Sequence, residues 1–186
     1  MLRNRNREKL IQAIVYLARN TRALGKIKLF KLLYLLDFEH FRQTGRSVTG
    51  MEYRAWKMGP VPIELMQEWD ELEGDLAAAI TIRPKKVIDY ERYEVTAKIA
   101  FDPSCFSKRE LSLLDQIAAQ HRDTLSEKMI DVTHAENGAW DKVWAGGEGN
   151  DHTINYRLAV ADDDPNREAV LEAADEFEAI RSALGQ

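Results

Sequence analysis

The amino-acid sequence predicts a mainly α-helical (α+β) fold: a single compact domain around one buried helix, with a small antiparallel β-hairpin or sheet. Residues 28–43 form a long apolar stretch of helical length, and residues 80–96 alternate apolar and polar positions as strands do. At 186 residues the chain is long enough to bury about 70% of its unfolded surface in one core. We therefore expect one domain over residues 1–186, with a basic N-terminal tail at residues 1–7.

The central element is a helix predicted over residues 28–43. Its apolar residues point in every helical direction, which is typical of a buried helix. It is too short and too charged to cross a bilayer, which requires roughly 20 apolar residues. Gly45 is expected to end it in a left-handed cap, a conformation that costs glycine no steric penalty. An amphipathic helix is predicted before it, over residues 8–19.

The segment after this helix is interpreted as a rigid corner. Residues 51–56 lead into Gly59, Pro60, Val61 and Pro62. The two prolines lack amide donors and push the preceding residues toward extended conformations, so no helix can run through the segment. Pro62 suits the first position of a new helix, which we expect over residues 63–72.

We predict a partner-binding groove beside this corner. A stiff segment with few free donors presents its shape without an ordering cost on binding, and tryptophan is favoured as an interface anchor. A purely structural corner is the alternative. The residues predicted to bind a partner are Lys31, Tyr53, Trp56, Lys57, Gly59, Pro60 and Val61.

A small antiparallel sheet is predicted near residues 80–96. Apolar and polar residues alternate on both sides of Pro84, Lys85 and Lys86, and β-branched and aromatic residues are frequent there. We therefore place the turn at these three residues. Two or three short strands are not stable alone, so the sheet is expected to pack on the helical body.

Local signals mark the later helices. Ser107 and Glu110 have the spacing of a capping box, and Ser126 is expected to cap the next helix in the same way. The glycine-rich residues 146–149 are interpreted as a flexible loop. Acidic residues and a proline at 162–165 introduce an acidic helix over about residues 165–184, whose narrow apolar stripe is expected to dock lightly on the core or on a partner.

Charge is distributed unevenly along the chain. The first 57 residues hold 13 Lys and Arg against 4 Asp and Glu, a charge of +9, and the remainder holds 13 against 27, a charge of −14. A basic first third suggests an acidic partner surface or nucleic acid, and the acidic remainder argues against general nucleic-acid binding. Mutual attraction of the two parts is the alternative. The single Cys105 fits a reducing compartment, and with no secretory signal or membrane span we expect a cytoplasmic protein.

No pattern in the sequence indicates catalysis, a cofactor or a metal site. The four histidines lack the spacing of metal ligands. Ser126 and His134 lie eight residues apart on one expected helix, about 12 Å along its axis, too far for a nucleophile and its base. The glycines at 146–149 lack the Lys-Ser/Thr of a phosphate loop. We therefore expect a protein that is not an enzyme.

Several short motifs follow one another in a characteristic order. Residues 28–35 read Lys-Leu-Phe-Lys-Leu-Leu-Tyr-Leu, Gly45 follows the helix, and residues 53–56 read Tyr-Arg-Ala-Trp before Gly59, Pro60 and Val61. Residues 125–134 and the pair at 139–140 continue the series. Over roughly residues 8–160 this order resembles the Panacea domain, also called the SocA-like antitoxin domain. The glycine-rich stretch and the acidic C-terminal helix depart from that pattern.

The resemblance implies a mostly helical antitoxin that binds and neutralises a toxin protein encoded beside it. One branch of the family is similar but acts as an adaptor that hands its toxin to a Clp-type protease, which is the alternative. The family has no established catalytic residues, so the resemblance assigns none. A nucleic-acid-binding regulator or an unrecognised hydrolase is the more distant alternative.

Overall fold

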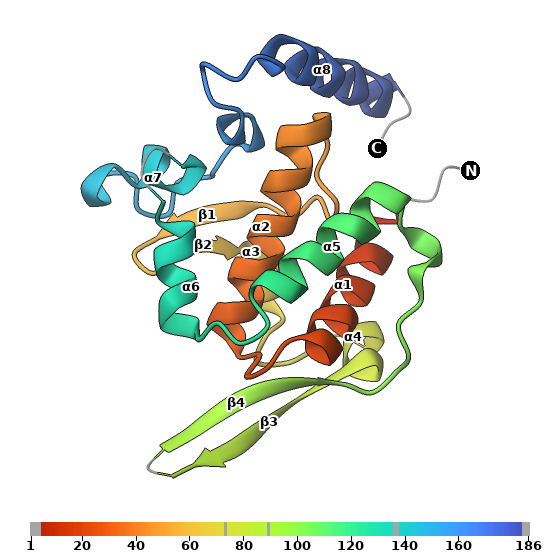
Figure 1. Cartoon of the computed structure of the whole chain (residues 1–186), viewed down its shortest axis with the longest axis vertical. Coiled ribbons are helices and arrows are strands. Elements are labelled where there is room, and N and C mark those ends of the chain that lie inside the picture. Colours follow the sequence, from red (N-terminus) through yellow and green to blue (C-terminus); the bar gives the residue numbers. More distant parts are fainter. Residues whose placement is uncertain (1–4, 73, 89, 136–137, 184–186) are drawn as a thin grey trace.

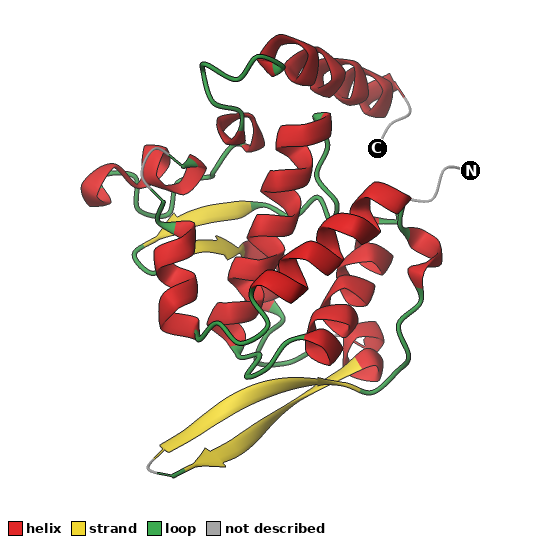
Figure 2. Cartoon of the chain, viewed as in Figure 1, coloured by secondary structure: helices red, strands yellow, loops and turns green. Residues whose placement is uncertain are grey.

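The computed structural model describes residues 5–72, 74–88, 90–135 and 138–183 (Figures 1 and 2). The order of its helices and strands is α1 Asn6–Asn20, α2 Lys26–Thr44, β1 Tyr53–Trp56, β2 Gly59–Pro62, α3 Ile63–Gln67, α4 Gly74–Ala79, β3 Ile80–Val87, β4 Tyr90–Ala97, α5 Lys108–Gln120, α6 Ser126–Thr133, α7 Ala139–Trp144 and α8 Arg167–Ala183. Short 3-10 turns lie at Pro103–Cys105, Ala145–Gly147 and Tyr156–Ala159. The predicted mainly α fold is confirmed.

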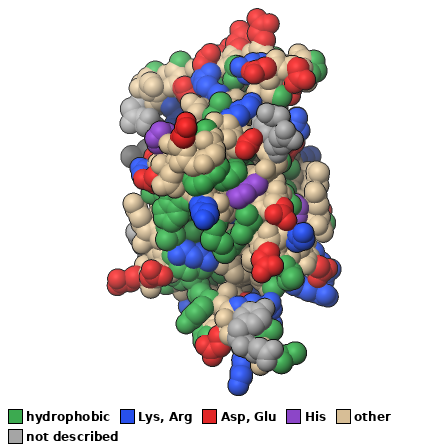
Figure 3. Space-filling view, turned by 90° about the vertical axis from the view of Figure 1, so that its left-hand side faces the viewer, with side chains coloured by type: hydrophobic (Ala, Val, Ile, Leu, Met, Phe, Trp, Pro, Cys, Tyr) green, Lys and Arg blue, Asp and Glu red, His purple; other side chains and the backbone are tan. Residues whose placement is uncertain are grey.

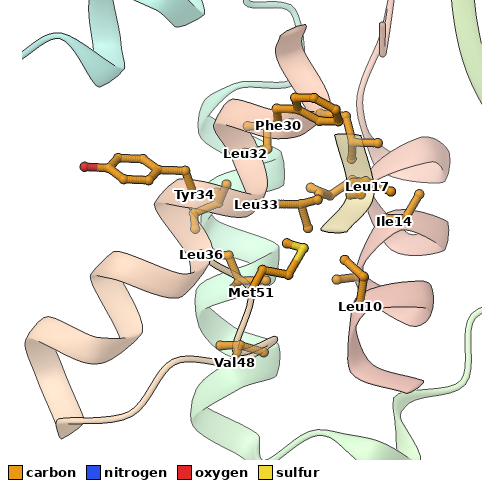
Figure 4. Close-up of a cluster of buried hydrophobic side chains, with 14 of the residues drawn as sticks. Leu10, Ile14, Leu17, Phe30, Leu32, Leu33, Tyr34, Leu36, Val48 and Met51 are labelled. Carbon is orange, nitrogen blue, oxygen red and sulfur yellow. The ribbon is translucent and has the colours of Figure 1, made fainter. Parts of the chain in front are cut away.

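Helix α2 runs through the middle of the molecule, with α1, α5 and α6 packed around it (Figure 1). Figure 4 shows apolar side chains of α1 and α2 facing one another in the core, among them Ile14, Leu17 and Leu33. The helix ends as predicted at Gly45, whose φ of 72° is left-handed. A β-carbon there would also lie 2.5 Å from the Val170 carbonyl oxygen of α8, so glycine allows both the cap and the contact.

The predicted corner is a β-hairpin. Strand β1 pairs antiparallel with β2, so that Tyr53 lies opposite Pro62 and Trp56 opposite Gly59. Pro62 precedes α3 as its N-cap instead of occupying its first position, and α3 ends at Gln67 instead of residue 72. The prolines are tolerated because β2 is an edge strand, where one row of amide donors is not needed for pairing.

The other edge of β1 is covered by a segment about a hundred residues downstream. The amide of Ala55 donates to the His152 carbonyl at 2.9 Å, and the amide of Ile154 donates to the Tyr53 carbonyl at 2.8 Å. Residues 146–149, interpreted from the sequence as a flexible loop, lead into this pairing through a 3-10 turn and further turns. Both edges of β1 are therefore paired.

The second hairpin projects from the helical body (Figure 1). Strands β3 and β4 pair antiparallel over eight residues each, and the turn lies beyond Val87, so the turn predicted at Pro84, Lys85 and Lys86 is wrong. Both strands are edges of a two-stranded sheet, and such a strand accepts a proline. The base packs on the body, since the amide of Val95 donates to the Leu24 carbonyl at 2.8 Å.

The helix starts are confirmed in part. Ser107 and Glu110 form the predicted capping box of α5. Helix α6 begins one residue earlier than expected, so Leu125 and not Ser126 occupies its cap position. Helix α8 begins at Arg167 and buries only Val170 and Ala174, in agreement with light docking.

At the chain ends, the structure describes only part of the predicted segments. Residues 1–4 of the predicted tail and residue 184 of the predicted last helix lie outside the described residues. Helix α1 already begins at Asn6, within the predicted tail. None of the helices in the described part of the chain combines the length and apolar character needed to cross a bilayer.

Candidate functional site

Three charged residues of α2 are buried: Lys28, Lys31 and Asp37. In the sequence, the charges along this helix argued against a membrane span, and their burial was not predicted. The signal was present, because a helix that is apolar nearly all round leaves no solvent-facing side for its charged residues. Buried charges need hydrogen-bond partners, and these partners connect α2 to the first hairpin and to the neighbouring loops.

Asp37 holds the chain that leads from α2 into β1. Its carboxylate accepts hydrogen bonds from the amides of Val48 and Thr49 at 2.8 and 2.7 Å, from the Thr49 hydroxyl, and from the Tyr53 hydroxyl at 2.8 Å. Burial raises the pKa of Asp37 to about 6, and the four hydrogen bonds oppose that rise. The carboxylate thus fixes β1 against the helix.

Lys31 supports the other strand of the hairpin. It is only 2% exposed, and its Nζ donates to the Pro60 carbonyl at 2.9 Å. Burial lowers the pKa of this ammonium to about 7, because little compensates for the lost water. Gly59 has a φ of 100° and leaves room for the lysine, since a β-carbon at this position would lie 2.7 Å from Nζ.

Aromatic rings pack next to Lys31. The rings of His134 and Trp140 stack with centroids 3.7 Å apart, and Trp140 Nε1 donates to the Trp56 carbonyl at 3.1 Å. Burial, followed by the charge of Lys31, lowers the pKa of His134. The Nε2 atom of His134 is buried and makes no hydrogen bond within the described part of the chain.

The accessible part of the site is the turn of the first hairpin. Trp56 Nε1 donates to Asp151 Oδ1 at 2.9 Å, while Lys57 is exposed and Met58 is 51% exposed. Gly59 lies next to Thr133 of α6, and the residues that precede them in the chain, Met58 and Val132, are both exposed. Figure 3 shows this side of the molecule, where hydrophobic side chains gather in the middle of the face.

The seven residues predicted to bind a partner are brought together here. Five of them are buried, namely Lys31, Tyr53, Gly59, Pro60 and Val61. Only Trp56 and Lys57 can touch a partner in this conformation, and the buried five hold the strands behind them. Their role in partner binding stays a prediction. Sequence reasoning missed Met58, whose apolar side chain next to Lys57 and Trp56 was the available signal.

The described residues show no cluster of metal ligands at this site. Within residues 5–72, 74–88, 90–135 and 138–183, no three His, Cys, Asp or Glu side chains come together as a metal site. Ser126 and His134 stand at opposite ends of α6, and His134 stacks on Trp140.

The fold and the site define a class of protein: a helical domain that fixes a short aromatic hairpin with buried charges and presents the hairpin turn at its surface. The family model of the antitoxin SocA-like Panacea domain matches residues 29–141, and the chain belongs to this family. The match confirms the resemblance found in the sequence. No curated protein and no solved structure shows a significant match to this chain.

Proposed function

We propose that this protein is a cytoplasmic antitoxin that neutralises a cognate toxin, encoded nearby, by direct protein–protein binding and without enzymatic activity of its own. This proposal rests on the membership of the chain in the SocA-like antitoxin family, because that membership supports a toxin as the partner. Neutralisation by binding needs no catalytic group. It is enough that the antitoxin covers the toxin's active surface or holds the toxin in an inactive conformation.

The turn of the β1–β2 hairpin is the surface best suited to this contact. Trp56 and Met58 offer apolar area, and tryptophan is enriched among residues that dominate binding energy. The strands behind them are held by Lys31 and Asp37 from inside the protein. A turn that is already fixed loses little conformational entropy when a partner binds.

The proposal is tested by co-expressing the chain with the product of the neighbouring open reading frame and scoring growth rescue and co-purification together. Rescue with a stable complex is the expected result. If growth is rescued while the toxin's half-life shortens, the protein acts as a protease adaptor instead. If the neighbour is harmless alone and no complex forms, the antitoxin assignment is wrong.

A matched pair of variants locates the contact. Met58→Glu and Ile88→Glu each replace an exposed apolar side chain in a hairpin turn with a carboxylate. We expect M58E to lose growth rescue and co-purification while it keeps its fold by circular dichroism. I88E should rescue growth as well as the wild type, and the opposite pattern would place the toxin on the second hairpin.

A further inference from the structure

A basic cleft lies on another part of the molecule, between the N-terminal end of α1, the end of α2, the start of α5 and α8. It has a volume of about 730 Å³. Four cationic side chains line it, and Glu110 is the acidic residue that joins them. Lys9 donates to Glu110 at 2.6 Å, so this pair is internally neutralised. The remaining positive charge is that of Arg5, Arg46 and Arg109.

These three arginines are poorly compensated. Arg46 and Arg109 are exposed and have no ion-pair partner among the described residues, although the Arg46 guanidinium lies over the Phe177 ring at 4.6 Å. Arg5 reaches Glu8 only at 4.0 Å, with both side chains more than half exposed. An exposed pair at this distance contributes little, so the cleft keeps a positive potential.

Other basic residues of the first third are paired within the fold. Arg7 binds Glu68 and Asp75, Arg42 binds Glu39, and Arg54 binds Glu52 and Asp151, in each case with at least one contact of 2.9 Å or less. Much of the basic excess seen in the sequence is therefore neutralised by the protein itself. Arg46 and Arg109, which have no ion pair among the described residues, and the weakly paired Arg5 lie together at the cleft, whereas Arg83 is an exposed arginine elsewhere, on β3.

The cleft also contains a buried histidine and apolar surface. His40 is 6% exposed, and its Nδ1 must donate to the Arg46 carbonyl at 2.6 Å, because a carbonyl only accepts. Phe106 and Phe177 add partly buried rings beside the arginines.

We propose that this cleft binds an acidic segment of the partner protein, with carboxylates on Arg46 and Arg109 and an apolar side chain against Phe106 and Phe177. This inference rests on the proposed function, because the partner is the toxin. Aromatic rings beside the cations suit a peptide better than a bare inorganic anion. Helix α8 forms one wall of the cleft through Phe177, an apolar contact that a peptide side chain can use.

The test uses the full chain and a fluorescein-labelled peptide of four glutamates around one phenylalanine, followed by fluorescence anisotropy at low salt. The double variant Arg46→Glu/Arg109→Glu removes the charge of the cleft. Arg83→Glu/Lys86→Glu makes the same charge change at exposed positions of β3 and serves as the matched control. We expect at least a tenfold loss of affinity in the first variant and less than a twofold change in the second.

Equal binding by both variants would overturn the inference, because the peptide would then sense only net charge. Stronger binding of a DNA duplex, or complete competition by inorganic phosphate at equal concentration, would also overturn it and assign the cleft to phosphate groups. Growth rescue tests the proposed function separately. If the peptide binds through Arg46 and Arg109 but the wild type does not rescue growth, the toxin is rejected as the partner. The cleft is then retained as a site for an acidic segment of another protein.

Discussion

The two hairpins share an antiparallel two-stranded architecture and differ in nearly every other respect. In β1–β2 the strands are four residues long, and buried side chains such as Tyr53 and Val61 fix them to the core. In β3–β4 the strands are eight residues long, and only the base packs on the helices. Ile88 near the far end is 93% exposed.

The comparison shows that a hairpin's rigidity comes from what lies behind it. The short hairpin is locked because α2 supplies a lysine beneath one strand and a carboxylate beneath the other. The long hairpin has more backbone pairing but little packing, and pairing alone gives marginal stability in water. Substitutions should therefore have large effects in the first hairpin and small effects in the second.

The largest effect is expected at Gly59. Gly59→Ala combines an unfavourable φ of 100° with a β-carbon 2.7 Å from Lys31 Nζ, and should lower the free energy of unfolding by about 3 kcal/mol or more. Gly146→Ala has a φ of 69° but no neighbour within 4 Å, so about 1 kcal/mol is expected. Gly74 has neither a left-handed φ nor a neighbour within 4 Å of an added β-carbon, so Gly74→Ala should be neutral or slightly stabilising. Urea unfolding of the three variants would contradict this account if they were equally stable.

The next effect is a pH dependence that belongs to Lys31. Its folded pKa of about 7 lies below the ordinary 10.5, so between these values the unfolded chain holds a proton that the folded chain releases. Stability should therefore rise with pH in this window, by roughly 3 kcal/mol from pH 7 to 10. Lys31→Met should reduce the rise and leave the part due to Lys28, whose pKa burial also lowers, and Lys86→Met, which removes an exposed amine, should not change it. Identical pH profiles for wild type and K31M would show that Lys31 is not the titrating group.

A smaller effect is expected from removing one hydroxyl in each hairpin. Tyr53→Phe takes a hydrogen bond of 2.8 Å from the buried Asp37 carboxylate and should cost about 1–3 kcal/mol at pH 7. Tyr93 in β4 is 60% exposed, so Tyr93→Phe should leave stability unchanged. Thermal unfolding would separate the two. A Tyr93→Phe loss as large as that of Tyr53→Phe would contradict the contrast between the hairpins.

The smallest effect is expected at the far end of the second hairpin. Ile88→Ala removes a side chain that is already in water, and its free energy of unfolding should stay within about 0.5 kcal/mol of the wild type. Val61→Ala, in the first hairpin, should cost at least 1 kcal/mol because Val61 is 7% exposed. A destabilised I88A variant would show that the end of this hairpin packs against something in solution.

Local signals in the sequence predicted the elements whose geometry is local. Gly45 ends α2 and the Ser107–Glu110 capping box starts α5, because each device involves residues within one turn. The first hairpin was missed because Pro60 and Pro62 argue against a strand, and only tertiary structure makes β2 an edge. The turn was misplaced at Pro84 for the same reason, since proline marks either a turn or an edge strand.

The residues selected from the sequence as a partner site lie together in the structure, but the way they are held in place could not be predicted. Trp56 and Lys57 lie at the surface of the hairpin, in the segment that the sequence analysis selected. The support beneath them could not be predicted, because the acceptor for Lys31 is the carbonyl of Pro60 and every residue has a carbonyl. The cleft of Arg46 and Arg109 joins residues far apart in the chain, so no local spacing reveals it.

The pairing of β1 with residues 151–154 has a consequence for synthesis on the ribosome. The first 140 residues already contain β1, β2 and most of the core helices, but not the segment that covers the outer edge of β1. An exposed strand edge invites pairing with other chains. Translation that stops before residue 151 would therefore release a chain whose β1 edge is open to pairing, because the segment that covers this edge has not been made.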